Sequence, residues 1–234
     1  GGAILCSQYI GQKNHEMANK SARQVLFIIT AISVAVTALC LLFRVPLLKL
    51  IFGKVEADVM TASQVYFFYT ALSFPFIALY DAGASIFRSQ GNTRGPMTVS
   101  VISNVINIGG NAALIWGFNM GVAGAAIATL ASRVFCAVVV LWQLRMDRQP
   151  IVVRNYRQIR PDGKMIGRVL ALGIPSGIEN SMFQLGKLAI QSSVSTLGTV
   201  AIAAQAMTNI LENLNGIAAI GVGIGLMTVV GQCL

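Results

Sequence analysis

The sequence predicts an all-α polytopic membrane protein, and two observations favour that fold class. The 234 residues are 55% hydrophobic and only 11% charged, whereas soluble domains carry about a quarter charged residues. Between Arg94 and Arg133 the chain has 38 residues without one ionisable side chain. Because a helical crossing needs roughly 20 apolar residues, this stretch fits two crossings. Residues 117–121, near its middle, predict the tight turn between them.

Uncharged stretches divide the chain into predicted spans. The first lies between Arg23 and Arg44, and the second follows Asp58. The third and fourth occupy the long stretch described above, and the last two follow a basic connector. Residues 1–10 are expected to be the last turns of an earlier helix. The predicted spans are 24–43, 59–87, 96–116, 122–144, 171–195 and 200–228.

Proline and small residues add detail to these helices. Pro75 and Pro175 lie within spans, where each removes a backbone hydrogen bond and permits a bend. Small residues crowd the segments 109–110, 121–126 and 203–204, which predicts close approach of helix backbones. The chain begins without Met or a charged leader and stops inside an apolar run, so we expect a piece of a longer polypeptide.

The distribution of basic residues predicts the orientation in the membrane. The loops 11–23, 88–94 and 145–168 together hold twelve basic residues, and the alternating loops hold three. The basic loops are therefore expected in the cytoplasm. The net charge of +9 is interpreted as topology and not as a nucleic-acid surface. Ile151, Val152 and Ile159 alternate with basic residues in the connector, so part of it is expected either along the inner leaflet or as a solvated loop.

The two ends of the chain resemble each other. Ser7 aligns with Gly231, and Gln8 with Gln232. Six spans lie between the matched positions, and an even number of crossings returns the chain to the same side. A duplicated protein with this period would have parallel repeats related by a pseudo-twofold axis along the membrane normal. The predicted organisation is an N-terminal lobe (1–145), a basic cytoplasmic connector (146–170) and the start of a C-terminal lobe (171–234).

Several segments carry a resemblance to one transporter family, in family order along the whole chain. The segments are SQYIG at 7–11, FRSQGNTR at 87–94, NIGGNAALIWG at 107–117, GVAGAAIAT at 121–129, GIPSG at 173–177, LGT at 197–199 and VGQ at 230–232. Together they resemble the multidrug and toxic-compound extrusion (MATE) family.

The resemblance implies a twelve-helix bundle of two six-helix lobes, of which this chain would run from the end of helix 2 into helix 8. It also implies a multi-pass protein of the cell membrane that works as a monomer when full length. Such a transporter expels small organic compounds, often cationic, in exchange for sodium ions or protons. It needs no cofactor, and it binds no metal beyond a transported sodium ion.

Amides on the third span suggest a cation site. Asn104, Asn107 and Asn111 follow helical spacing, and their oxygens could coordinate a dehydrated cation. Thr129 on the next span could add a hydroxyl. The resemblance implies that positions matching Asn107, Asn111 and Thr129 line a site, together with an Asp on helix 1. Many relatives have Asp where this chain has Asn111. Hydrogen bonding between helices remains an equal alternative for these side chains.

Ionisable residues in the spans give further candidates, because a charge in lipid is costly unless it has a function or a partner. Glu179 and Glu212 are candidates for exchanging protons or binding a drug cation, and Lys187 is expected to neutralise one of them. Asp81 and Arg133 are expected to approach each other as a structural pair, directly or through water. Three amides are expected to contact substrate: Gln184, Gln205 and Asn209.

Two alternatives remain beside ion-coupled export. A flippase for lipid-linked oligosaccharides would have a related fold, but it would need a strongly cationic cavity, and Arg133 and Lys187 are the only basic residues well within spans. A membrane-embedded enzyme is disfavoured because His15, the only histidine, lies in a loop. The four cysteines are scattered without metal-ligand spacing. No enzymatic activity is therefore expected.

Overall fold

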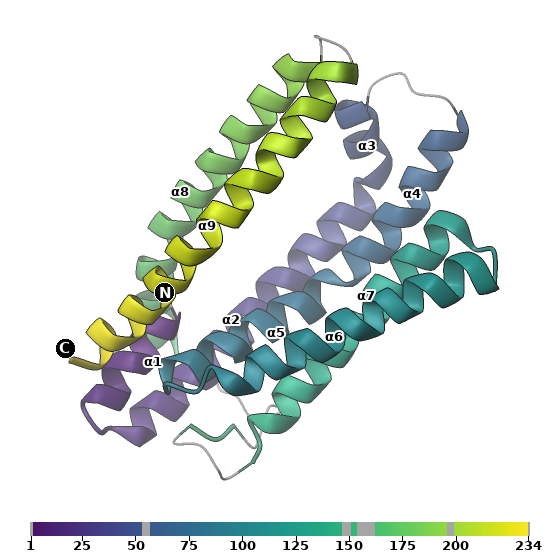
Figure 1. Cartoon of the computed structure of the whole chain (residues 1–234). Coiled ribbons are helices and arrows are strands. Elements are labelled where there is room, and N and C mark those ends of the chain that lie inside the picture. Colours follow the sequence, from purple (N-terminus) through teal and green to yellow (C-terminus); the bar gives the residue numbers. More distant parts are fainter. Residues whose placement is uncertain (1, 53–56, 147–150, 154–161, 196–198, 234) are drawn as a thin grey trace.

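The computed structural model is a bundle of long helices (Figure 1) that describes residues 2–52, 57–146, 151–153, 162–195 and 199–233. These residues contain no strand. The elements in chain order are α1 (Gly2–Gly11), α2 (His15–Leu42), α3 (Arg44–Phe52), α4 (Ala57–Leu72), α5 (Phe74–Ser89), α6 (Arg94–Ala112), the π-helical turn η1 (Ala113–Gly117), α7 (Gly121–Gln143), α8 (Gly163–Ser195) and α9 (Thr199–Cys233).

Each predicted span is helical in the structure, and the fold class is confirmed. Among the described residues, five helical segments are long and apolar enough to cross a membrane: His15–Leu42, Met60–Ser89, Arg94–Gly117, Gly121–Gln143 and Ala204–Cys233. Helix α8, where the sequence predicts another crossing, is long enough but is absent from this set. Its middle carries Glu179, Gln184 and Lys187, which interrupt the apolar sequence of the helix.

Proline has different effects in the two predicted bends. The second span is broken at Ser73, and Pro75 lies in the first turn of α5, where its missing N–H removes no helical hydrogen bond. The Ser73 hydroxyl donates to the carbonyl of Thr70 at 2.6 Å, which closes the end of α4. The interruption expected near Pro75 is therefore confirmed, whereas the expected loss of a helical hydrogen bond there is not observed. Pro175 lies inside α8, which continues through it.

The predicted turn in the uncharged stretch is confirmed. Helix α6 continues as η1 to Gly117, and α7 begins at Gly121. Asn119 and Gly121 both have a φ of +52°, a left-handed conformation that Asn and Gly adopt more readily than other residues. The two helices then pack tightly. A Cβ added at Gly110 would lie 3.1 Å from the Ala128 Cβ, and one added at Gly124 would lie 3.0 Å from the Leu114 Cβ.

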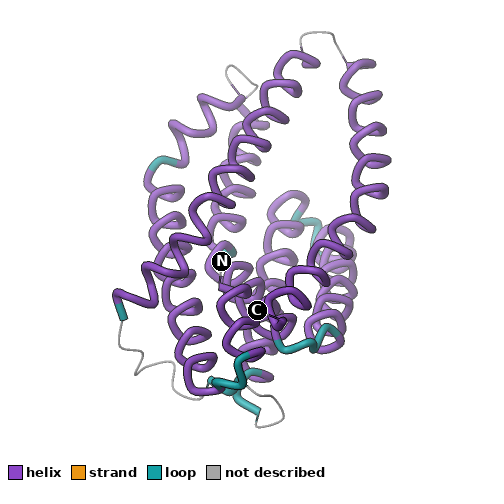
Figure 2. Tube along the Cα trace, turned by 90° about the vertical axis from the view of Figure 1, so that its left-hand side faces the viewer, coloured by secondary structure: helices purple, strands orange, loops and turns teal. Residues whose placement is uncertain are grey.

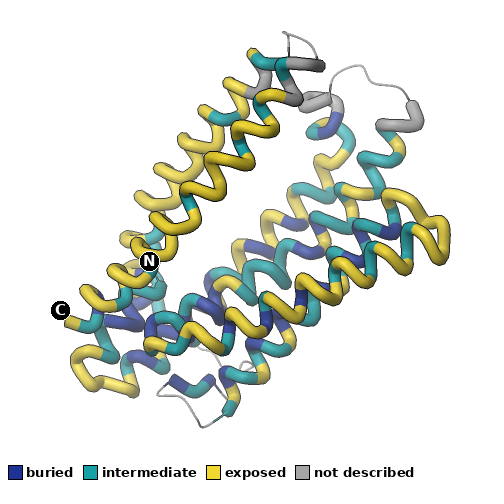
Figure 3. Tube along the Cα trace, viewed as in Figure 1, coloured by how far each residue is buried: buried dark blue, intermediate teal, exposed yellow. Residues whose placement is uncertain are grey.

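Helices α2 and α4–α7 pack together, while α8 and α9 lean away from them (Figure 1). Helices α8 and α9 are close together where α8 ends and α9 begins, and they separate toward the other end (Figure 2). Buried residues concentrate in α1, α2, α5 and α7, whereas α8 and α9 are mostly exposed (Figure 3). The core is therefore formed mainly by α1, α2, α5 and α7, with contributions from Ile151, Val153 and Val169.

The end of α9 crosses α1 without room for further side-chain atoms. A Cβ added at Gly11 would lie 2.1 Å from the Gln232 carbonyl oxygen, and one added at Gly231 would lie 2.7 Å from the Ser7 hydroxyl oxygen. The Gln232 side chain also donates to the Ser89 carbonyl at 2.8 Å. This crossing joins α9 to the helices that form the core.

The connector differs from both expectations for it in the part that the structure describes. Ile151 and Val153 are fully buried in the core, so they lie neither on a leaflet nor in solvent. The Ile151 amide donates to Gln90 Oε1 at 3.1 Å, and the Val152 amide donates to Asn19 Oδ1 at 2.8 Å. These side-chain acceptors satisfy the backbone, which allows the segment to be buried. Ile159 lies outside the described residues.

Helix α8 begins at Gly163, earlier than the start near residue 171 that the apolar pattern predicts. Asp162 explains the early start. Its Oδ1 accepts from the amides of Lys164 at 3.1 Å and Met165 at 3.4 Å, as an N-cap does. Its Oδ2 lies 2.5 Å from the Lys20 ammonium of α2. The bond to Lys20 holds the pKa of the Asp162 carboxyl below its usual value of 3.8.

Candidate functional site

Three of the predicted cation-site residues meet between α6 and α7. The Asn107 side-chain nitrogen lies 3.4 Å from the Thr129 hydroxyl oxygen, and the Asn111 nitrogen donates to Asn107 Oδ1 at 3.1 Å. Asn107 and Asn111 face the same neighbour because they are one helical turn apart. Asn104, which the spacing places near them, is exposed and makes no hydrogen bond among those described. Of the three predicted asparagines on α6, only Asn107 and Asn111 therefore take part in these contacts.

The sequence prediction missed one member of this cluster. The Ser132 hydroxyl lies 3.4 Å from the Asn107 nitrogen, and the Ser103 hydroxyl donates to the Ser132 carbonyl at 3.1 Å. Ser132 follows Thr129 by three residues, so helical spacing was the available signal for it. We call Asn107, Asn111, Thr129 and Ser132 the amide cluster.

The amide cluster combines hydrogen bonding between helices with an unused acceptor. Asn111 Oδ1 is buried and has no hydrogen-bond partner among the described residues. A buried polar atom without a partner costs about 1–3 kcal/mol, so it is rarely left unused. A buried amide carbonyl oxygen without a partner is a type of ligand that hard cations prefer. The cation role of these residues stays a prediction.

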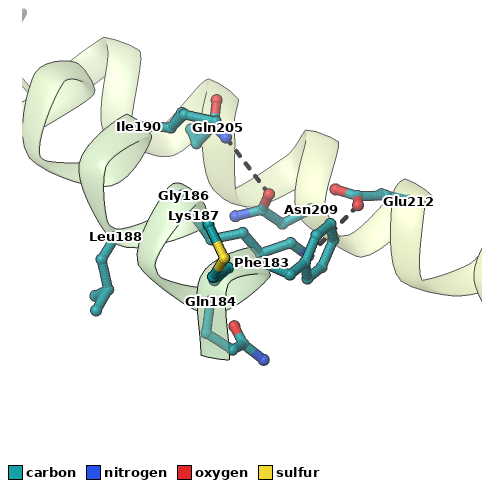
Figure 4. A pocket seen from close by; sticks show the side chains of 10 residues that line it. Phe183, Gln184, Gly186, Lys187, Leu188, Ile190, Gln205, Asn209 and Glu212 are labelled. Atoms are coloured by element: carbon teal, nitrogen blue, oxygen red, sulfur yellow. Dashed lines mark hydrogen bonds and ion pairs between the residues drawn. The ribbon is translucent and has the colours of Figure 1, made fainter. Parts of the chain in front are cut away.

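A second site lies in a groove of about 760 Å³ between α8 and α9 (Figure 4). All three predicted substrate amides line it, together with Glu212 and Lys187, and apolar side chains form the remainder of its wall. The lining residues are Met182, Phe183, Gln184, Gly186, Lys187, Leu188, Ile190, Gln205, Asn209 and Glu212.

Charges in this groove are paired. The Lys187 ammonium lies 3.4 Å from Glu212 Oε1, which confirms that Lys187 is placed to neutralise one of the two carboxylates. The same ammonium lies 5.0 Å from the centre of the Phe183 ring, within the range of a cation–π contact. Gln205 Nε2 lies 3.5 Å from Asn209 Oδ1. Phe183 was missed in the sequence, where its spacing of four residues from Lys187 was the signal.

The remaining candidates lie apart from this groove. Glu179 is exposed on α8 and is not one of the residues that line the groove. Arg133 Nη1 donates to the Ser73 hydroxyl oxygen. Asp81 is exposed, and in the part of the chain that the structure describes no ion pair joins it to Arg133. The two residues therefore make no direct pair, and a contact through water stays a prediction.

Comparison with protein families gives one match. The MatE family model matches residues 1–113. Those residues contain α1 to α6 and both amides of the amide cluster.

Two curated relatives match nearly the whole chain. A probable multidrug resistance protein of Bacillus subtilis, YoeA, is 27% identical over 100% of this chain and 51% of its own length. A probable multidrug resistance protein of Thermotoga maritima, NorM, is 28% identical over 99% of this chain and 50% of its own length. The chain therefore spans about half the length of the curated relatives that it matches.

Solved structures show the same fold. A mutant of the Vibrio cholerae MATE transporter VcmN superposes with a TM-score of 0.86 at 22% identity, covering 99% of this chain and 52% of that one. A MATE structure in the bent conformation gives a TM-score of 0.80 at 20% identity over 99% of this chain and 49% of that one. At this level of identity the likeness concerns the fold.

Proposed function

This chain belongs to the multidrug and toxic-compound extrusion family, and we propose that the complete protein exports organic compounds in exchange for sodium ions or protons. In this proposal the two lobes alternate between conformations that open to opposite sides of the membrane. Members of this family are transporters and not enzymes. The names of the B. subtilis and T. maritima relatives support a multidrug substrate range.

The amide cluster is the observation that carries the coupling part of the proposal. It brings two amides and two hydroxyls from α6 and α7 together, and it leaves the buried Asn111 Oδ1 free to bind an ion. A cation that binds there would supply the missing partner. Because binding free energy can favour one conformation over another, the ion gradient would then drive the transport cycle.

The proposed organisation follows the predicted repeats. Residues 1–145 belong to the first lobe and residues 171–234 begin the second, with the connector on the cytoplasmic side of the cell membrane. The tight crossing of α1 and α9 supports this division, because it joins the matched ends of the two repeats. Such a protein would work as a monomer with small organic substrates.

The partners of the two basic residues within spans disfavour the flippase alternative. A lipid-linked pyrophosphate needs unpaired cations in the cavity. Lys187 lies beside the Glu212 carboxylate, which offsets its charge, and Arg133 lies on a different helix with Ser73 as its partner, so these two residues do not together form a strongly cationic cavity. Ion-coupled export therefore remains the better supported function.

The test is dye efflux from cells that express the complete gene, with the sodium and pH gradients collapsed separately. Replacing Asn111 by Ala removes the unpartnered oxygen. We expect the apparent affinity for the coupling ion to fall about tenfold or more, since a lost ligand of about 1.4 kcal/mol has that effect.

Asn104→Ala is the matched control, because it removes the same group from the exposed side of the same helix. Efflux that depends on the ion to the same extent in Asn111→Ala as in this control would remove the amide cluster from coupling. Efflux that persists when both gradients are collapsed would overturn ion-coupled export itself.

A further inference from the structure

The Lys187 ammonium occupies the two groups that would recognise a positively charged ligand in the groove. It lies 3.4 Å from Glu212 Oε1 of α9 and 5.0 Å from the centre of the Phe183 ring, one turn earlier on α8. Figure 4 shows the end of the Lys187 side chain at the Phe183 ring, with a dashed line to the Glu212 carboxylate. A carboxylate and an aromatic face are the elements by which proteins bind organic ammonium groups. Both are already in use by a side chain of the protein.

The groove has room for a ligand beside this contact. Its volume of about 760 Å³ lies within the range of about 300–1,000 Å³ that is usual for small-molecule sites. The amides of Gln184, Gln205 and Asn209 supply hydrogen-bonding groups on its wall. With Lys187 in place, the charges of Glu212 and Lys187 cancel, so the groove offers a cation no net attraction.

Lys187 is able to leave. Its side chain is 41% exposed, and that of Glu212 is 54% exposed. A pair with this much solvent access is weak, in the range of about 0–1 kcal/mol. The four-carbon stem of lysine also allows the ammonium to swing into water while the stem remains on the apolar wall. Displacement of the ammonium by a ligand is therefore within reach of ordinary binding energies.

We propose that Lys187 is a tethered competitor for organic cations in the α8–α9 groove. A ligand with a delocalised positive charge takes its place against Glu212 and Phe183. A weakly hydrated organic cation loses less on leaving water than lysine ammonium regains on returning to it, so the exchange selects for such ligands. This inference rests on the proposed export function in one respect, which is that it takes the groove as a substrate site.

The experiment measures equilibrium binding of tetraphenylphosphonium to the complete protein in detergent. Lys187→Met removes the competitor and leaves Glu212 unpaired, so we expect the dissociation constant to fall by up to about fivefold, which corresponds to a pair of about 1 kcal/mol. Lys164→Met is the matched control, because it removes the same charge from an exposed position of α8 outside the groove, and its affinity is expected to be unchanged. Glu212→Gln is expected to bind the probe more weakly than wild type.

Equal or weaker binding by Lys187→Met than by the Lys164→Met control overturns the proposal. The same holds if Lys187→Met loses binding of an anionic dye that the wild type binds, since Lys187 would then attract the ligand. If Lys187→Met does not fold, as judged by thermal unfolding, Lys187→Arg decides. Arginine binds carboxylate more strongly, so its variant must bind the probe more weakly, and unchanged binding overturns the proposal.

Binding and transport separate this inference from the proposed function. If Lys187→Met binds tetraphenylphosphonium more tightly but the complete protein exports no dye, the role of Lys187 as a competitor is supported and export is overturned. If instead the complete protein shows ion-driven efflux, but Lys187→Met and Lys164→Met bind the probe equally well, export is kept and the role of Lys187 as a competitor is overturned.

Discussion

An amide side chain on a membrane-spanning helix has to find its partners inside the protein, because lipid offers none. Asn107 meets this requirement with Asn111 and with two hydroxyls of α7, whereas Asn111 keeps one buried oxygen without a partner. In the groove between α8 and α9, Lys187 and Glu212 are partners in an ion pair. Asn107, Lys187 and Glu212 are therefore held by specific contacts.

Asp162 gives a prediction at the scale of one residue. Its folded pKa is lowered, chiefly by the bond to Lys20, so its carboxylate stabilises the fold at a pH above the unfolded value of 3.8, and this contribution disappears as the pH falls through the folded value. Asp162→Asn keeps an oxygen to cap α8 but loses the charge. We expect its thermal unfolding midpoint to lie below that of wild type at pH 7.

The difference between the two proteins should shrink as the pH is lowered below about 4, where the wild-type carboxyl also becomes neutral. Measuring both midpoints from pH 7 to pH 3 checks this expectation. A gap that stays constant or widens in acid would show that the Lys20 contact contributes nothing. Lys164→Met serves as the control, because it is a nearby change that leaves the backbone N–H of residue 164, which donates to Asp162, in place.

The sequence predicted much of the site at the residue scale, and its failures have physical reasons. The meeting of Asn107, Asn111 and Thr129 followed from helical spacing and from the resemblance. Phe183 was missed because its spacing of four residues from Lys187 becomes informative only once the Lys187 ammonium has been placed over its ring. Asp81 and Arg133 were expected to approach each other, directly or through water, from the cost of charge in lipid; the structure gives the arginine Ser73 as a neutral partner, and a contact through water stays a prediction.

At the scale of the element, gaps between charged residues located the helices, and local hydrogen bonds set their ends. The span predicted at 96–116 is observed as Arg94–Gly117. The start of α8 was missed because Asp162 caps the helix at Gly163, before the apolar run begins. The burial of Ile151 and Val153 was missed because their alternation with basic residues also fits a membrane surface, and only Gln90 and Asn19 reveal the difference.

The crossing of α1 and α9 gives a prediction at this scale. A Cβ at Gly11 would lie 2.1 Å from a backbone oxygen of α9, and a backbone cannot move aside as a flexible side chain can. Gly11→Ala should therefore cost about 1–3 kcal/mol, as overpacking does, and should lower the thermal unfolding midpoint of the complete protein.

Gly167→Ala makes the same chemical change on α8, where nothing lies within 4 Å of the new Cβ, and it should be neutral or stabilising. Equal midpoints for the two variants would mean that the crossing has room to adjust.

At the scale of the whole molecule, the exposed surface is that of a membrane protein. Met97, Val105 and Ile108 on α6 are each about two-thirds exposed at 67%, 65% and 69%, and α8 and α9 expose many more large apolar side chains. A soluble monomer rarely exposes apolar patches larger than a few hundred Å². We expect the protein to stay in the membrane fraction after a high-salt wash and to require detergent for a monodisperse preparation. A compact monomer in plain buffer would contradict the fold class.

The contact between Ser7 and Gly231 has a geometric consequence. Aligning the two ends of the sequence makes these residues counterparts, and the structure places one against the other. Two counterparts related by a twofold rotation touch only if the rotation axis passes between them. If the two halves move against each other as proposed, the contact between Ser7 and Gly231 is a pivot, and its two residues stay close together. Spectroscopic labels at exposed positions next to this crossing should report a nearly fixed separation, while labels on the distant ends of the helices should report the full change in distance.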